Sequence, residues 1–196
     1  SAAKSYIAAT GNSSFGYFGG GDPGNISTVD RIDYTNDTAA PLVKGPLSAA
    51  KLGIAATGNA SFGYFGGGGP APSPLTTVDR IDYSNDTATA VAKGPLSVGR
   101  RYFAATGNAN FGYFGGGGNP SAIATVDRID YSNDTGTAPA KGPISSVRGG
   151  LAASSSRANA IPLKGPAVLE VPVSLGAFSH NSGPQGFDFG YFGGGW

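Results

Sequence analysis

The sequence lacks most of the residues from which catalytic and metal sites are built. It contains no cysteine, no methionine and a single histidine among 196 residues. The absence of cysteine excludes a disulfide framework, a thiolate metal site and a cysteine nucleophile. One histidine excludes a site with several histidine ligands and a relay between histidines. We therefore predict that the protein is not an enzyme and carries no cofactor.

Charged residues are also scarce. They make up 13% of the chain, about half of the usual ~25%. The net charge is +1, so the electrostatic footprint of a nucleic-acid-binding protein is missing. No apolar run approaches the roughly 18 residues that a membrane-spanning helix requires. We expect neither nucleic-acid binding nor membrane insertion.

Glycine and proline are abundant, with 34 and 14 residues, and much of this glycine belongs to an internal repeat. The block Ala-Thr-Gly-Asn-x-x-Phe-Gly-Tyr-Phe-Gly-Gly-Gly occurs at Ala9–Gly21, Ala56–Gly68 and Ala105–Gly117. The block Thr-Val-Asp-Arg-Ile-Asp-Tyr-x-Asn-Asp-Thr follows at Thr28–Thr38, Thr77–Thr87 and Thr125–Thr135, and Lys-Gly-Pro begins at Lys44, Lys93 and Lys141. The period is about 49 residues. We predict one repeat domain, 1–196, with units 1–49, 50–98 and 99–147 and a degenerate fourth unit, 148–196.

Each unit has the pattern of four short β-strands. In the third unit we expect strands centred on Tyr102–Thr106, Phe111–Phe114 and Thr125–Tyr131, and a short fourth strand before Gly142. β-branched and aromatic runs separated by Gly and Asn-Asp turns are typical of β-structure, and no apolar stripe of helical period is present. The predicted fold class is therefore all-β.

A single four-stranded sheet with an aromatic second strand cannot bury both of its faces. Stacking successive units would bury them, as in propellers and solenoids. The triple glycines permit close backbone approach and positive φ angles. We therefore predict a β-propeller-like repeat protein of about four blades, with the fourth blade degenerate.

The order of these motifs resembles the kelch repeat. In that family a double glycine follows an apolar strand, a Val-x-Arg-Tyr-Asp segment comes next, and an arginine opens the following unit. Gly66-Gly67, Val78, Arg80, Asp82 and Arg100 occupy matching places. The resemblance covers roughly residues 1–148 and implies a β-propeller. The repeats also look like those of uncharacterised virion structural proteins of phages that infect aquatic bacteria.

The last residues repeat the aromatic–glycine block out of phase. They carry Phe187, Phe189, Tyr191, Phe192 and Trp196. We expect this strand either to close the propeller by pairing with the first strand of the chain or to pair with a neighbouring subunit, because an unpaired strand edge is a template for strand addition.

Recurring acidic residues are the remaining candidates for chemistry. Asp-x-x-Asp-x-x-x-Asp recurs at Asp30, Asp79 and Asp127, and neighbouring asparagines add hard oxygens that would suit Ca²⁺. A structural role is favoured, in which Asp33 and Asp37 cap turns and Arg31 and its equivalents pair with an aspartate on the same or a neighbouring strand. The repeated lysines are expected to be solvated turn residues. Identical recurrence in three units argues against a single asymmetric catalytic pair.

The leading hypothesis is a structural or attachment module of a virion or another extracellular assembly. Its expected partners are further copies of the chain or other structural proteins. One alternative is a carbohydrate-binding propeller that recognises a surface glycan through Tyr17, Tyr64, Tyr113 and Tyr191 as equivalent aromatic platforms, which could equally be packing residues. Another is a filament-forming Gly/aromatic subunit.

Overall fold

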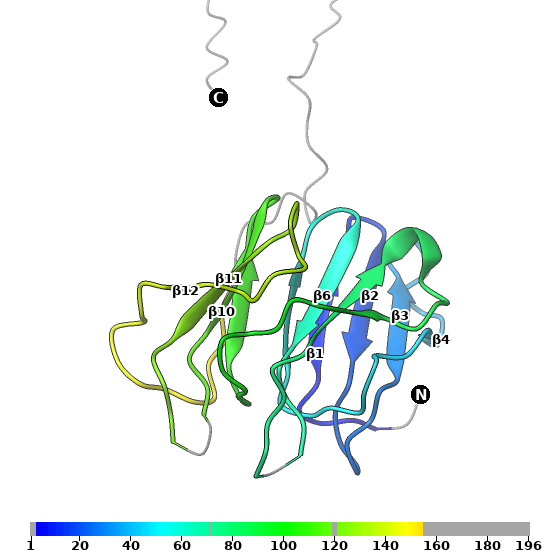
Figure 1. Ribbon diagram of the computed structural model, residues 1–196. Coiled ribbons are helices and arrows are strands. Elements are labelled where there is room, and N and C mark those ends of the chain that lie inside the picture. The colour runs from blue at the N-terminus through cyan, green and yellow to red at the C-terminus, as the bar shows by residue number, and fades with distance from the viewer. Residues whose placement is uncertain (1–2, 71, 119–120, 155–196) are drawn as a thin grey trace, which may run out of the picture. The chain divides into compact units, whose positions relative to one another are not determined.

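The computed structural model describes residues 3–70, 72–118 and 121–154, all within the compact unit Ser1–Leu163. These residues form three antiparallel four-stranded sheets in which the strands follow one another in chain order (Figure 1). The first sheet contains β1 (Ala8–Gly11), β2 (Phe15–Gly19), β3 (Val29–Asp33) and β4 (Leu42–Lys44). The second contains β5 (Ala55–Gly58), β6 (Phe62–Gly66), β7 (Val78–Asp82) and β8 (Val91–Lys93). The third contains β9 (Ala104–Gly107), β10 (Phe111–Gly115), β11 (Val126–Asp130) and β12 (Ala140–Lys141).

The turn between the first two strands of each sheet is held by an asparagine side chain. Asn12 Oδ1 accepts hydrogen bonds of 2.9 Å from the backbone N–H groups of Ser14 and Phe15. Asn59 and Asn108 make the same pair of bonds in the second and third sheets. This is the local backbone bonding for which asparagine is favoured in turns.

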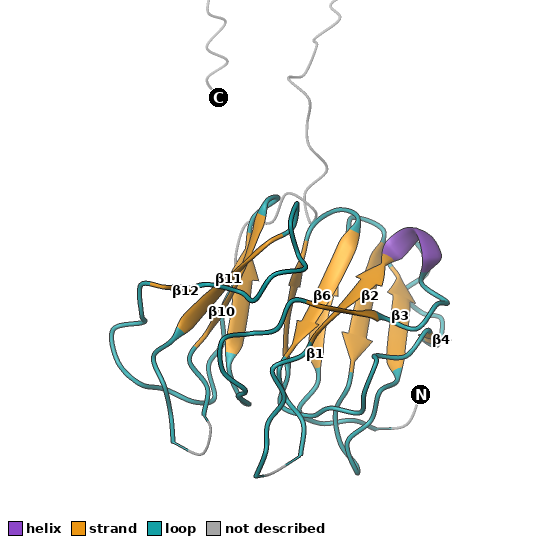
Figure 2. Ribbon diagram, viewed as in Figure 1, coloured by secondary structure: helices purple, strands orange, loops and turns teal. Residues whose placement is uncertain are grey.

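The third strand of each sheet ends in an aspartate that caps the following turn. Asp82 accepts bonds from the backbone N–H and the hydroxyl of Ser84, and the one short 3₁₀ helix of the described residues, η1 (Tyr83–Asn85), begins there (Figure 2). Asp33 and Asp130 cap the equivalent turns through Thr35 and Ser132. The predicted capping role of Asp33 is thereby confirmed.

Consecutive sheets pack face to face, and the apolar core lies between them. One cluster joins Tyr17, Val29 and Leu47 of the first sheet to Phe65 and Ile81 of the second. A second cluster joins Tyr64, Val78 and Leu96 of the second sheet to Phe114, Ile129 and Tyr131 of the third. The first and second sheets therefore bury their aromatic second strands against the next sheet, as the stacking argument requires.

Glycine makes this packing possible at one position in each contact. A Cβ atom on Gly19 would stand 2.8 Å from the ring of Phe65, and a Cβ on Gly66 would stand 2.9 Å from the ring of Phe114. Both separations are shorter than a normal carbon–carbon contact. The Phe-Gly-Tyr-Phe-Gly motif thus supplies both the ring that packs against the preceding sheet and the space that receives the ring of the following sheet.

The third strand of each sheet carries an aspartate that forms a buried ion pair, which the sequence pattern did not predict. Lys4 pairs with Asp30 at 2.7 Å, Lys51 with Asp79 at 2.9 Å and Arg100 with Asp127 at 2.7 Å. Both side chains of the second and third pairs are 0% exposed. Each pair links the segment that opens a unit to the third strand of a sheet.

The fourth unit begins in phase with the others. Gly117 N–H donates to Arg148 O at 2.7 Å, as Gly21 does to Lys51 O and Gly68 to Arg100 O. Arg148 therefore corresponds to Arg100. Residues after 154 lie outside the described part, and with them the predicted strand Phe187–Trp196.

The structure confirms the all-β class and the four short strands of each of the first three units. Among residues 3–70, 72–118 and 121–154, the three sheets do not form a closed ring. The expected division into about four blades, and a single domain spanning 1–196, remain predictions.

Candidate association face

Each contact between sheets contains a buried carboxylate that is bound by three side chains. Asp86, in the turn after β7, accepts a 2.9 Å hydrogen bond from the Tyr17 hydroxyl of the preceding sheet. Its carboxylate also pairs with Arg31 at 2.7 Å and with Lys44 at 3.2 Å. A turn of one sheet is thus fixed to three consecutive strands of its neighbour.

The same arrangement recurs between the second and third sheets. Asp134 accepts a 2.9 Å hydrogen bond from Tyr64 and pairs with Arg80 at 2.8 Å and Lys93 at 3.2 Å. Arg31 and Arg80 therefore pair with a turn of the next sheet, and not with an aspartate on their own or a neighbouring strand. The prediction that Lys44 and Lys93 are solvated is wrong, because each contributes to this contact with 14% of its side chain exposed.

The carboxylate and the phenol influence each other's protonation. Burial and the hydrogen bond to Asp86 both raise the pKa of Tyr17, and burial and Asp134 do the same for Tyr64. Burial alone would raise the pKa of Asp86, but hydrogen bonds from Tyr17, Lys44 and Arg31 outweigh it and hold that pKa below its ordinary value. The tyrosines are consequently neutral donors and Asp86 is an ionised acceptor at neutral pH.

Tyrosine stacking completes each contact. The ring of Tyr17 stacks on Tyr83 and the ring of Tyr64 on Tyr131, both with centroids 4.8 Å apart. Tyr17 and Tyr64 are 0% exposed, so neither offers a free ring face to a sugar. Of the four tyrosines named as platforms, Tyr113 alone is described and only partly buried, and Tyr191 lies outside the described residues.

The glycine of each Lys-Gly-Pro motif fits closely against the next sheet. Gly45 N–H donates to Asp86 O and Gly94 N–H donates to Asp134 O, both at 2.8 Å. A Cβ atom on Gly45 would collide with the carbonyl of Ala88, and one on Gly94 with the carbonyl of Gly136. We refer to the carboxylate, the stacked tyrosines and this glycine contact together as the joint.

The third sheet carries the receiving half of the joint without the other half. Tyr113 and Arg128 are directly opposite each other on β10 and β11, and Lys141 is opposite Val126, as in the other two sheets. The side chains of Tyr113, Arg128 and Lys141 form no hydrogen bond or ion pair with another residue of the described part, whereas those of Tyr64, Arg80 and Lys93 bind Asp134. A Cβ on Gly142 would meet no atom within 4 Å.

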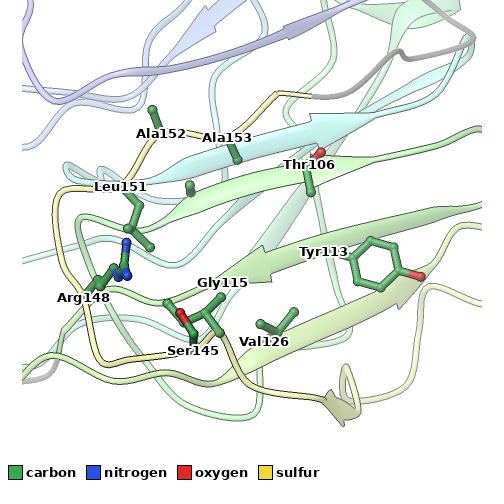
Figure 3. A pocket seen from close by; sticks show the side chains of 11 residues that line it. Thr106, Tyr113, Gly115, Val126, Ser145, Arg148, Leu151, Ala152 and Ala153 are labelled. Carbon is green, nitrogen blue, oxygen red and sulfur yellow. The ribbon is translucent and has the colours of Figure 1, made fainter.

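This exposed face encloses a hollow of about 550 Å³. Figure 3 shows Gly115 and Val126 between Tyr113 on one side and Leu151 on the other, with Ala152 and Ala153 on the segment beyond. A Cβ on Gly115 would be 3.5 Å from Val126 and 3.8 Å from Ile144, both of its own unit, and no aromatic ring of the described residues lies within 4 Å of it. We call this surface the open face.

Neither a metal cluster nor a membrane span is found in the part of the chain that the structure describes. No three histidine or acidic side chains there are grouped so that they could hold a metal ion. The described residues also include no helix of the length and apolarity that crossing a bilayer requires.

The depressed pKa of Asp86 predicts a loss of stability in acid. The pKa of an aspartate in an unfolded chain is about 3.9. The stabilisation from Asp86 is therefore complete above that pH, and it is lost as the pH falls through the lower pKa of Asp86 in the folded protein. Urea unfolding between pH 7 and pH 2.5 should show a shallower acid slope for Asp86→Asn than for the wild type. Equal slopes for the two proteins would contradict this role of Asp86.

No family model matches the chain, and no curated relative matches it. Among solved structures, that of YjhT is similar, with a TM-score of 0.60 and 12% sequence identity. The match covers 74% of this chain and 54% of YjhT, so the chain spans about half the length of that structure. At this identity the likeness concerns the fold alone, and it places the chain among all-β proteins with repeated four-stranded units.

Proposed function

We propose that the protein is a non-enzymatic structural module, a β-propeller segment that joins other β-units of an assembly through its open face. The observation that carries this proposal is the unoccupied third copy of the joint. Two copies are filled within the chain, by Asp86 and by Asp134. The third presents the same donors on the same strands with nothing opposite them among the described residues.

The apolar character of the face supports association rather than simple exposure. In the filled contacts, Val29 and Val78 are fully buried, and Leu47 and Leu96 are nearly so. Their equivalents Val126 and Ile144 border the hollow of the open face. Covering this surface removes apolar area from water, which is the dominant favourable contribution to protein association.

The location and partners follow from the same proposal. A module of this kind suits a virion or another extracellular assembly, where its neighbours are further copies or other structural proteins. An aromatic C-terminal strand with Phe187, Phe189, Tyr191, Phe192 and Trp196 could complete the propeller in the same chain or in a neighbour. The carbohydrate-binding alternative depends on Tyr113, which lines the hollow of the open face.

The test fills the hollow without disturbing the fold. Gly115→Leu places a side chain in the open hollow, so the free energy of unfolding should change little, whereas Gly66→Ala should destabilise the closed contact beneath Phe114. Light scattering over a range of concentrations should give a mass above 19.4 kDa for the wild type and 19.4 kDa for Gly115→Leu. A wild-type protein that stays at 19.4 kDa throughout would overturn the proposed association.

A further inference from the structure

The open face has a matching surface at the other end of the chain. The turn after β3 holds Tyr34 and Asp37, which correspond to Tyr83 and Asp86 of the second sheet and to Tyr131 and Asp134 of the third. Tyr34 is 54% exposed, whereas Tyr131 is 8% exposed. Asp37 is also exposed.

We propose that the open face binds the Tyr34–Asp37 turn of a second copy of this chain, with the Asp37 carboxylate held by Tyr113, Arg128 and Lys141. This inference rests on the proposed function and names its partner. It predicts that Tyr34 of the second copy stacks on Tyr113, as Tyr83 stacks on Tyr17. It also predicts that Gly142 N–H donates to Asp37 O, as Gly45 N–H donates to Asp86 O.

The receiving arginine is already positioned by its own sheet. Arg128 lies over the ring of Phe111, with its Cζ 4.5 Å from the ring centroid. The corresponding distances are 4.2 Å for Arg31 over Phe15 and 4.4 Å for Arg80 over Phe62. Because the guanidinium has the same place with and without a carboxylate opposite it, binding does not have to reorganise it.

The charges of the two surfaces are complementary. The open face presents Arg128 and Lys141, and the turn of the first sheet presents Asp37, in the ratio of two cations to one carboxylate found in both filled joints. A carboxylate that contacts these two cations accepts charge-assisted hydrogen bonds from them, and such bonds are stronger than hydrogen bonds between neutral groups. Head-to-tail contact of this kind yields a ring if the rotation closes and a filament if it does not.

Two differences make the joint between copies weaker than the joints within a chain. Ala90 and Ala138 donate their N–H groups to Pro46 O and Pro95 O of the preceding sheet, but Pro41 stands at the equivalent position and has no N–H. Leu151 already lies against Gly116, in the place that Ile54 takes against Gly20. The segment containing Leu151 has to move aside before the first strand of a second copy can take that place.

Complementation of two defective variants tests the proposal. Asp37→Ala removes the inserted carboxylate and Arg128→Ala removes a receiving group, so light scattering of either variant alone should show loss of the wild-type association, to a mass of 19.4 kDa. An equimolar mixture contains one intact pair of surfaces and should form a complex of twice that mass. Asp130→Ala, an exposed change on the same strand as Arg128, is the control and should associate like the wild type.

The outcomes separate this inference from the proposed function. Association that Gly115→Leu abolishes but Asp37→Ala leaves intact would overturn the second-copy partner while the open face remains an association surface. Two variants that stay monomeric when mixed would also overturn it. A wild-type chain that is monomeric at every concentration would overturn both proposals.

Discussion

Asp127→Ala is expected to be among the most destabilising single changes in the protein. Asp127 and Arg100 are both 0% exposed, and Arg100 Nη2 donates to Asp127 Oδ2 at 2.7 Å and to Phe114 O at 3.1 Å. Removing one partner of a buried pair leaves the other charge without compensation, at a cost of about 3–5 kcal/mol. Since domains of this size are stable by about 5–15 kcal/mol, urea unfolding should show the loss of a large part of the total.

Two controls distinguish the buried charge from the loss of an ordinary side chain. Asp130→Ala removes a carboxylate that accepts hydrogen bonds from Ser132 in the turn after β11, and should cost much less stability than Asp127→Ala. The double change Arg100→Met with Asp127→Leu removes both charges and should recover much of the stability that Asp127→Ala loses. An Asp127→Ala protein that is no less stable than Asp130→Ala would show that this ion pair does not hold the unit together.

Alanine at Gly94 and at Gly142 should have opposite consequences, although both glycines occupy the same position of the repeat. A methyl group on Gly94 would collide with the carbonyl of Gly136 in the next sheet and displace the hydrogen bond from Gly94 N–H to Asp134 O. Overpacking of this kind costs about 1–3 kcal/mol, and loss of the hydrogen bond adds about 1 kcal/mol.

In Gly142→Ala, the added methyl group would have no atom within 4 Å. Neither Gly94 nor Gly142 has a positive φ, so backbone strain does not separate the two variants. At low protein concentration Gly142→Ala should therefore leave the free energy of unfolding within about 0.5 kcal/mol of the wild type. Equal destabilisation of the two variants in dilute solution would show that the third sheet is covered within a single chain.

The repeat itself made the strands predictable. Period, turn asparagines and β-branched runs placed the strands of the third unit within about two residues of their observed ends, because these signals act locally. The aspartates that cap turns were recognisable for the same reason. Their partners are two residues away.

The joint could not be derived from local pattern, because its partners are far apart in the chain. Tyr17 and Asp86 are 69 residues apart, and Arg80 and Asp134 are 54 apart. One signal was available. Arg, Asp and Lys recur at constant spacing in the first three units, each set after a Tyr at a slightly varying distance, so a contact made once should be made at each boundary between these units. The buried pair of Lys51 and Asp79 was harder to predict from the repeat, because an arginine takes the place of the lysine in the third unit.

The exchange rate of the Gly142 amide hydrogen tests the central claim most directly. Gly45 and Gly94 donate their N–H groups to carbonyls of the next sheet, so their amides should exchange slowly at any protein concentration. We predict that Gly142 exchanges rapidly in dilute solution and becomes protected, as they are, when the wild-type protein is concentrated, but not when Asp37→Ala is. A Gly142 amide that exchanges rapidly at every concentration would contradict the account of the open face as an unfilled joint.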